Sequence, residues 1–495
     1  MAVFTAIASV ITGIISGAGF SAAFAAATSL ATGVTALGVA TSLVAGGLAL
    51  ATAKALGPDV PSIQAAKDPG VKVQLDPSTD NRVPVFYGRV FTGSIAVDAE
   101  IKNQNNTMVY VMVIGEKTDT GTYTVNDIYR GDAKLNFTGA TVTSITDPNA
   151  TSSTNVNGKM RCRVYAGNAQ SSVNQIFPTT GKVAAQTLCS TIDTTTNYED
   201  LVYAIFELDY DPENGLTGLG QLTFDITNSL NSPANVLYDY MTNARYGAGI
   251  PVSSIDTDSI DDMWDYSNIN GAYGNVEYTT TANVSAYHSR WQIDGVLSTY
   301  QPVKDNIDRI CTSSSTFFTY DPKGGKFKAV PNREATAGEK SAAFVFNNDN
   351  IISKIEIGST ELYSYYNSIE AEYPAVNQKD QTSTVIVETP AGDRQANEPD
   401  NGLNIRYDLI NDAPRAKNLA NLDLRQSRFD TVVTFDADYS AIQVDVGDIV
   451  KLTESTYGFN EKLFRVMRVT EKEDESGMLA VKVVALEYDD SVYTH

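Results

Sequence analysis

The chain has 495 residues and carries 59 Asp and Glu against 36 Lys and Arg, which gives a formal net charge of −23. Such a surface repels a phosphate backbone, so sequence-wide, specific nucleic-acid binding is disfavoured, although a negatively charged wall would let DNA slide past. With only two histidines, His288 and His495, histidine-based catalytic triads and multi-histidine metal sites are nearly excluded. The length allows several domains of about 100–200 residues each.

The three cysteines, Cys162, Cys189 and Cys311, lie far apart and form no C-x-x-C motif. Neither a disulfide framework nor a zinc site is encoded, and we expect reduced structural thiols and no cofactor or metal. Short runs rich in Thr, Val, Tyr and Asn predict a mainly β fold with short α-helices beyond the N-terminal segment.

The N-terminal segment, residues 1–56, has no charged residue between residues 2 and 53 and is rich in Ala and Gly. It lacks the basic start and short apolar core of a signal peptide, so cleavage is not expected. Small residues favour close helix packing, in protein or in lipid. Helices packed inside an assembly are the favoured interpretation; a segment that acts on the target membrane and a resident membrane anchor remain open. The candidate packing or membrane-contacting residues are Ala26, Ala36 and Val44.

A linker begins at the Gly-Pro-Asp-Val-Pro run of residues 57–61, because proline disfavours helix in the residue before it. Apolar, β-branched runs predict strands at 83–97 and 108–114, and again at 201–208 and 221–226. Between them, the Thr-, Asn- and Ser-rich region of residues 121–185 predicts a polar, peripheral β module inserted into one sheet-forming unit.

Helices are predicted in the middle of the chain. Ser232 can cap a helix over residues 232–243, with Pro233 at its favoured first position. A second helix should begin near residues 256–259, and a third places Cys311 in the core. A hairpin follows at 317–330, then strands at 351–357 and 364–372 and a helix at 415–428. The chain ends in a β unit with strands at 432–435, 449–452, 463–469 and 479–486.

Two stretches resemble the central tail hub, or tip attachment, proteins of long-tailed bacteriophages and gene transfer agents, which are relatives of the baseplate hub. Residues 83–90, V-P-V-F-Y-G-R-V, are similar to the family's opening P-x-x-Y-G-R-V element through Pro84, Tyr87, Gly88 and Arg89. Residues 233–249 are similar to its helix followed by t-n-x-R-Y-G-x-G, and this is the most specific stretch. The residues that carry it are Pro233, Asn243, Arg245, Tyr246, Gly247 and Gly249.

Two further stretches follow in the order expected for the family. Residues 291–297, W-Q-I-D-G-V-L, contain Gly295 and precede a helix and a Gly-Gly-Lys hairpin. The last comprises V-G-D-I-V at 446–450, with Gly447 and Asp448, and E-Y-D-D-S-V-Y at 487–493, with Asp490 and Tyr493. Each stretch also has a local explanation, since glycines end helices and form tight turns. We expect the motifs to be architectural.

The resemblance implies a structural, non-enzymatic protein of the virion, at the distal end of the tail, with two tail-tube-like β-barrels per chain. Three chains would then match a sixfold tube. The implied partners are the tail tube or distal tail protein, the tape-measure protein, other tail-tip and receptor-binding proteins, and transiently the host membrane. The expected domains are a first barrel at 57–120 and 186–230 interrupted by the 121–185 module, an α/β connecting domain at 231–345, and a second barrel domain at 346–495.

Competing functions remain open. A tail-borne cell-wall hydrolase would use paired carboxylates, such as those within 256–265 or 207–213, although the first group also suits a helix N-terminus. A calcium site at Glu207, Asp209, Asp211 and Glu213 lacks the rest of a calcium-binding loop, and solvated charges are favoured there. Many relatives continue into fibre-like modules, whereas this chain stops after residues 489–493, so we expect other proteins to bind the receptor.

Overall fold

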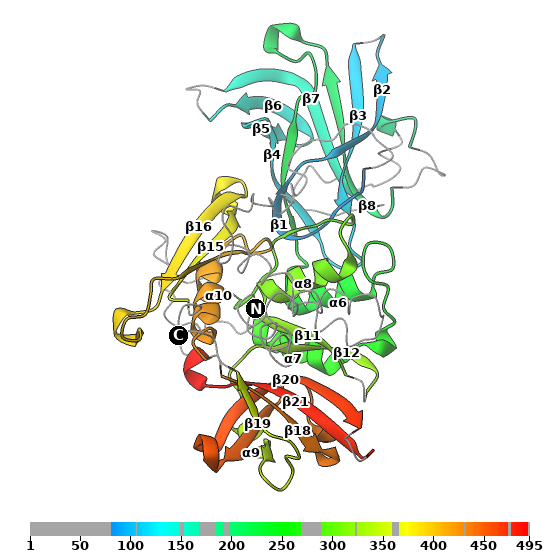
Figure 1. Cartoon of the computed structure of the whole chain (residues 1–495). Coiled ribbons are helices and arrows are strands. Elements are labelled where there is room, and N and C mark those ends of the chain that lie inside the picture. Colours follow the sequence, from blue (N-terminus) through cyan, green and yellow to red (C-terminus); the bar gives the residue numbers. More distant parts are fainter. Residues whose placement is uncertain are drawn as a thin grey trace, which may run out of the picture.

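The computed structural model describes residues 81–493 except 105, 149–152, 168–184, 186, 193–197, 269–288, 322–323, 359–365, 430 and 474–476. The predictions for residues 1–56, including Ala26, Ala36 and Val44, lie outside the described residues. The described part is mainly β, as predicted. Figure 1 shows a β-barrel at one end, a helical layer in the middle and a second large sheet at the other end.

The barrel is built from a ten-stranded sheet of order β10-β1-β9-β4-β5-β6-β7-β8-β3-β2. A parallel pairing of β1 with β3, at Val85 and Glu116, closes it, so β2 and β10 lie outside the ring. The strands are β1 (Val85–Thr92), β2 (Ile95–Lys102), β3 (Thr107–Glu116), β4 (Tyr123–Arg130), β5 (Ala133–Thr138), β6 (Thr141–Thr146), β7 (Thr154–Ala166), β8 (Leu201–Asp209), β9 (Leu222–Asn228) and β10 (Gly295–Leu297).

The prediction of a separate peripheral module at residues 121–185 is wrong for its strands, β4 to β7. β4 pairs with β9 and β7 pairs with β8, so these strands complete the barrel wall. Val125, Val142 and Met160 are fully buried in the same core as Phe86 and Phe206. The many Thr and Asn residues made these strands look peripheral in the sequence. Alternate residues of a strand face opposite sides, so only half of them need to be apolar to enter the core. The other domain boundaries remain predictions.

The helical layer comprises α6 (Pro233–Thr242), α7 (Thr257–Ser267), α8 (Val303–Ser313) and the hairpin β11 (Thr316–Asp321) and β12 (Lys326–Pro331). The predicted helices and hairpin are confirmed, and Cys311 is buried among apolar side chains of this layer. Ser232 occupies the N-cap position of α6, but its side chain makes no capping bond there. Its hydroxyl instead accepts a hydrogen bond from Asn268 Nδ2 at 3.1 Å.

The C-terminal half forms two sheets with separate cores. A three-stranded sheet of order β16-β15-β17 packs against α10, and a six-stranded sheet has the order β13-β19-β20-β21-β18-β14. The predicted strand at 351–357 is shorter than expected, since only Glu356–Gly358 belong to it. The elements are α9 (Ala337–Ala342), β13 (Phe344–Phe346), β14 (Glu356–Gly358), β15 (Ser368–Ala375), β16 (Gln381–Glu388), β17 (Gly402–Arg406), α10 (Ala413–Gln426), β18 (Val432–Asp438), β19 (Ile449–Glu454), β20 (Phe459–Glu473) and β21 (Leu479–Glu487).

Because β7 shares its core with β1 and β9, a cavity in β7 should weaken the whole barrel. We expect Met160→Ala to lower the free energy of unfolding by about 2–5 kcal/mol and to speed amide exchange in β1 and β9 as well as in β7. Thr124→Ala, at an exposed position of β4, should change stability by about 0.5 kcal/mol or less. Faster exchange confined to β4–β7 in Met160→Ala would restore the idea of a separable module.

Candidate functional site

The first three sequence motifs meet where β1, α6 and β10 come together, a place that we call the junction. It contains Tyr87, Gly88 and Arg89 of β1, residues 239–249 of α6 and the following turn, and residues 293–295. These segments are far apart in the sequence, yet β1 pairs with β10 from Val85 to Tyr87. The apolar side chains of α6 pack in the same core as those of β1 and β10. The motif residues therefore form one structural unit.

A buried carboxylate holds two tyrosines at the centre of the junction. The hydroxyls of Tyr87 and Tyr246 both donate to Asp239 Oδ2, each at 2.8 Å. Burial raises the pKa of the Asp239 carboxyl, while the two hydroxyls act in the opposite direction. Burial, with the nearby carboxylate adding to it, raises the pKa of both tyrosines, so both remain protonated donors. Asp239 thereby ties β1 and the turn after α6 to one helix.

Gly88 lies where β1 changes partner from β10 to β9, and it has a φ of +63°. A Cβ at this position would lie 2.2 Å from Asp294 Oδ1 and 2.3 Å from the Ile293 carbonyl oxygen. The same Asp294 oxygen accepts a hydrogen bond from the Arg89 main-chain N–H at 2.8 Å. Both the backbone conformation and the close approach of Asp294 therefore require glycine.

Two arginines of the motifs anchor the junction to the barrel. Arg89 forms a bidentate pair with the buried carboxylate of Asp225, at 2.9 and 2.7 Å. Arg245 lies 3.2 Å from Glu116 Oε2 and donates to the carbonyl oxygens of Lys117 and Asp200 at 2.7 and 3.0 Å. A fork of donors that binds carboxylate and carbonyl oxygens together is specific to arginine. The turn after α6 is thus fixed to the end of the barrel.

The remaining residues of the second motif shape that turn. Asn243 Oδ1 accepts from the main-chain N–H groups of Arg245 and Tyr246, at 2.8 and 3.3 Å, which closes the chain back on the helix. A Cβ on Gly247 would lie 2.0 Å from the Tyr240 carbonyl oxygen, and Gly249 has a φ of +62°. Each glycine is therefore required by its backbone, as the local explanation of the motif suggests.

The other motif residues also have structural partners. The Pro84 carbonyl accepts from Glu116 N at 2.7 Å beside the closure of the barrel, and Pro233 is the first residue of α6. Gly295 is the first residue of β10, and a Cβ added to it would lie only 2.5 Å from the Leu409 side chain. The fourth motif lies apart from the junction. A Cβ on Gly447 would contact the Val330 side chain, and the Asp448 carboxylate accepts a hydrogen bond from Asp445 N. The Asp490 carboxylate accepts from Lys340 and Tyr488, and the Tyr493 hydroxyl donates to Asn332 Oδ1.

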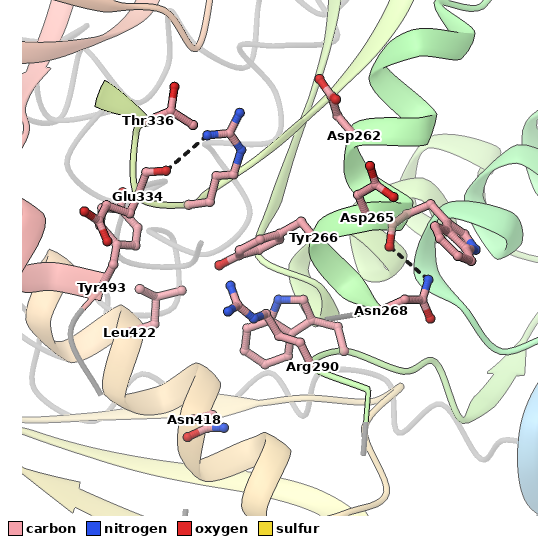
Figure 2. A pocket seen from close by; sticks show the side chains of 13 residues that line it. Asp262, Asp265, Tyr266, Asn268, Arg290, Glu334, Thr336, Asn418, Leu422 and Tyr493 are labelled. Carbon is pink, nitrogen blue, oxygen red and sulfur yellow. Dashed lines mark hydrogen bonds between the residues drawn. The ribbon is translucent and has the colours of Figure 1, made fainter. Parts of the chain in front are cut away.

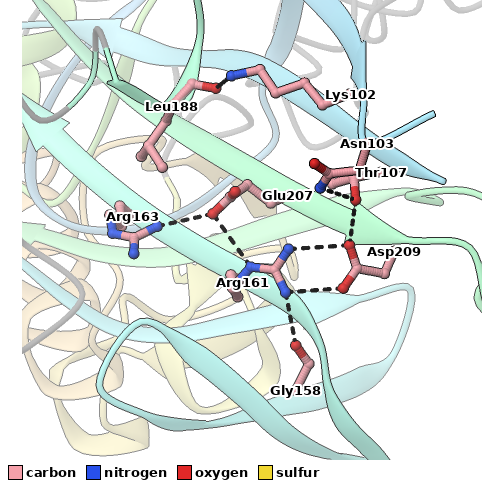
Figure 3. A network of polar contacts seen from close by, with 9 residues as sticks. All are labelled: Lys102, Asn103, Thr107, Gly158, Arg161, Arg163, Leu188, Glu207 and Asp209. Carbon is pink, nitrogen blue, oxygen red and sulfur yellow. Dashed lines mark hydrogen bonds and ion pairs between the residues drawn. The ribbon is translucent and has the colours of Figure 1, made fainter. Parts of the chain in front are cut away.

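Glu207 and Asp209, considered above as calcium ligands, bind arginines instead (Figure 3). Arg161 donates to both oxygens of Asp209, at 3.1 and 3.2 Å, and Arg163 donates to Glu207 Oε2 at 3.1 Å. Asp211 accepts from Asn214 Nδ2 in the next turn, at 2.8 Å. Across the residues that the structure describes, no group of three or more His, Cys, Asp or Glu side chains is placed to hold a metal ion. Glu207 and Asp209 are paired rather than solvated, which differs from the favoured interpretation of the sequence.

The carboxylates at 256–265, considered for a hydrolase, begin and line α7. Asp256 is the N-cap residue of α7 and Asp258 lies in its first turn, where the positive end of the helix dipole favours acidic residues. Burial raises the pKa of four other carboxyl groups, which lie outside α7 and have different neighbours from one another. These are Glu116, Asp239, Asp294 and Asp308. Over the described ranges, no helix is both long and apolar enough to cross a membrane.

Two glycine substitutions separate the close contact at Gly88 from the cost of its positive φ. Gly131 has a similar φ of +59°, and a Cβ added there would meet no heavy atom within 4 Å, so Gly131→Ala should cost about 1–2 kcal/mol of unfolding free energy. We expect Gly88→Ala to cost about 1–3 kcal/mol more, because Asp294 and Ile293 must move. Urea unfolding of both variants measures the difference. Equal losses would show that the junction accommodates a side chain at residue 88.

Comparison with known proteins relates this architecture to phage tails. Residues 304–469 match the family model described as "Putative phage tail protein". A chain of the structure "Virion of native gene transfer agent (GTA) particle" is similar in fold, with a TM-score of 0.51 and 13% identity over 85% of this chain and 88% of that chain. No curated protein matches the sequence.

Two tail proteins show weaker similarity. The tail protein from Neisseria meningitidis MC58 has a TM-score of 0.30 and 10% identity, over 41% of this chain and 58% of that chain. The 43 kDa tail protein of prophage MuSo2 from Shewanella oneidensis has a TM-score of 0.30 and 11% identity, over 58% of this chain and 74% of that chain. From α8 to β20 the chain is thus similar to a phage tail protein family, and its fold is similar to that of a gene transfer agent virion chain, which confirms the resemblance carried by its sequence motifs.

Proposed function

We propose that this chain is a structural, non-enzymatic component of a phage-type tail, the hub that closes the tail tube at its distal tip as a homotrimer. The observation that carries the proposal is the similarity of fold to a gene transfer agent virion chain over 85% of this chain, together with the tail-family match at 304–469. The junction supports it, because its motif residues are used as structural ties and its carboxylates already have partners.

Among the described residues, the outer strands of the two large sheets supply surfaces through which copies would meet. β2 is the outer strand of the barrel sheet and exposes Val97 and Ile101, which are 40% and 57% accessible. In the six-stranded sheet, β13 and β14 are the outer strands and expose Val345 and Ile357. Exposed apolar edge strands favour pairing with another chain. One such edge on each large sheet gives a trimer six exposed edges, in keeping with a sixfold tube.

The uncharged N-terminal run suits a role in DNA delivery. Residues 2–53 contain no charge, and even partly apolar surface costs about 25 cal/mol per Å² when it is left in water. In the proposed hub, three copies of this run pack near the tail axis, against one another or against the tape-measure protein, and occlude the tube. After triggering, the same small-residue surface enters the host membrane and assists DNA passage. A membrane-perforating role is therefore the second candidate function, and it rests on this run alone.

The oligomeric state tests the hub proposal directly. Three copies of the 53.3 kDa chain should give an assembly of about 160 kDa by analytical ultracentrifugation, and tail tips should show threefold symmetry by cryo-electron microscopy. Ile101→Lys should weaken the trimer, because it places a charge on the exposed edge of β2. Ile352→Lys is the matched control, since Ile352 is 50% exposed but lies outside the strands, between β13 and β14. A ring of six copies, or a monomer in the particle, would refute the proposal.

Charges placed in the N-terminal run test its role in delivery. We expect the triple variant Ala26→Lys, Ala36→Lys and Val44→Lys either to block assembly or to give particles that adsorb but do not deliver DNA, because each lysine must be desolvated. The matched control, Ala26→Ser, Ala36→Ser and Val44→Thr, keeps the run uncharged and should remain infectious. Plaque and DNA-release assays measure the outcome. Normal infectivity of the lysine variant would exclude both the plug and the membrane-entry mechanisms.

A further inference from the structure

An open groove of about 670 Å³ lies between α7, α10 and the chain that precedes α9 (Figure 2). Both tryptophans of the chain line it. Trp291 is 2% exposed and belongs to the core, whereas Trp264, on α7, is 45% exposed. A half-exposed tryptophan at the edge of a groove is typical of binding surfaces. Tryptophan is enriched there among the residues that dominate affinity.

The same helix carries an acidic stripe, which we define as Asp258, Asp261, Asp262 and Asp265. These residues are spaced three and four apart, so they share one side of α7, and all four are exposed. α7 contains no lysine or arginine, and within the described part of the chain no ion pair involves these four residues. Like charges at this spacing destabilise a helix, and Asp265 lies in the last turn, where the helix dipole also disfavours an anion.

The two arginines that line the groove do not pair with the stripe. Arg333 forms a bidentate pair with Glu339, at 2.9 and 2.8 Å, which raises the pKa of its guanidinium, and the nearby Asp262 carboxylate adds to that rise without forming an ion pair. The Arg290 guanidinium lies over the Tyr266 ring, 4.2 Å from its centroid. Figure 2 shows Asp262 and Asp265 on α7 at one side of the groove, with Tyr266 and Arg290 below them. The groove therefore combines an accessible indole with carboxylates that form no ion pair among the described residues.

We propose that this groove docks a basic segment of another protein, with one lysine or arginine side chain over Trp264 and others beside Asp262 and Asp265, since residues two apart on a helix do not share one neighbour. A cation over an indole face is attracted by the ring, and tryptophan binds cations best among the aromatic residues. The carboxylates add charge complementarity, which selects a basic partner and repels acidic proteins and nucleic acid. A neutral saccharide would use the aromatic face but gains nothing from an acidic stripe.

The chain supplies an internal argument about the occupant. Residues 269–288, which lie between Asn268 and Arg290 in the sequence, contain no lysine or arginine, and their one histidine, His288, is mostly neutral at pH 7 because the ordinary pKa of histidine is about 6.5. Lys54, Lys67 and Lys72, in the N-terminal part, could provide the cation, so the test below includes them. This inference concerns contact with a further protein and does not depend on the position of the chain at the tail tip.

The test is a fluorescence titration of the full-length protein with a hexalysine peptide, with hexaglutamate as the charge control. Hexalysine should change the emission of Trp264, and Trp264→Phe should remove most of that change, while Trp291, which is only 2% exposed, still reports a folded protein. Asp262→Asn with Asp265→Asn should raise the Kd about tenfold, because two charge contacts are lost. The matched control is Glu213→Gln with Asp349→Asn, which removes two exposed carboxylates on other elements and should change the Kd less than about twofold.

Several outcomes would overturn the proposal. An equal loss of affinity in the control pair would show general attraction to an acidic protein. An unchanged Kd in the Asp262 and Asp265 variant, or an unchanged signal in Trp264→Phe, would place binding elsewhere. Quenching by a chitooligosaccharide but not by hexalysine would identify a saccharide groove. About tenfold tighter binding after Lys54→Gln, Lys67→Gln and Lys72→Gln would show that the chain itself occupies the groove.

Discussion

The main-chain groups along one edge of β1 are the constraint on which the arrangement of the whole molecule depends. β1 pairs with β9 from Gly88 to Thr92, but on its other side β10 covers only Val85 to Tyr87. A buried N–H group without a partner costs about 1–3 kcal/mol, so the groups beyond Tyr87 need other partners. Side chains provide them: Asp294 accepts from Arg89 N, Asp380 accepts from Phe91 N, and Asn411 donates to the Arg89 carbonyl, at 2.8, 2.8 and 3.0 Å.

This edge joins parts of the protein that would otherwise form separate units. Asp294 comes from the segment that leads into β10, Asp380 from the β15–β16 hairpin, and Asn411 from the chain just before α10. Together with the Asp239 ties to Tyr87 and Tyr246, they hold the barrel, the helical layer and the small sheet to a single strand. These ties are stronger than most, because hydrogen bonds to charged groups are stronger than those between neutral groups.

The mainly β fold, the central helices and the hairpin could be predicted from the sequence, but the hydrogen-bond partners of the motif residues could not. Tyr87, Gly88, Arg89, Arg245 and Gly247 are identified through the resemblance to tail hub proteins, and the local pattern explains only the glycines, which end a helix or allow an unusual backbone. The partners of the β1 residues are ordinary aspartates and asparagines, 136 to 322 residues away along the chain, and nothing in the local pattern distinguishes them. The prediction of a peripheral module at 121–185 was wrong for a related reason. The polar residues of its strands dominate the composition, whereas the alternating apolar residues face the core. The groove was missed because it needs two helices and a loop brought together by folding.

The distance along the chain between β1 and its partners also orders events during synthesis. Arg89 leaves the ribosome 322 residues before Asn411, which at about 5–20 residues per second is a delay of roughly 15–65 s. During that time β1 can pair with β3 and later with β9, but its other edge is open to non-native pairing. The ring of strands is complete at Asn228, but this edge of β1 is fully covered only when Asn411 has been made. A product truncated before Asn411 therefore keeps an unsatisfied edge on β1, so the cover of this strand reports that synthesis has reached α10.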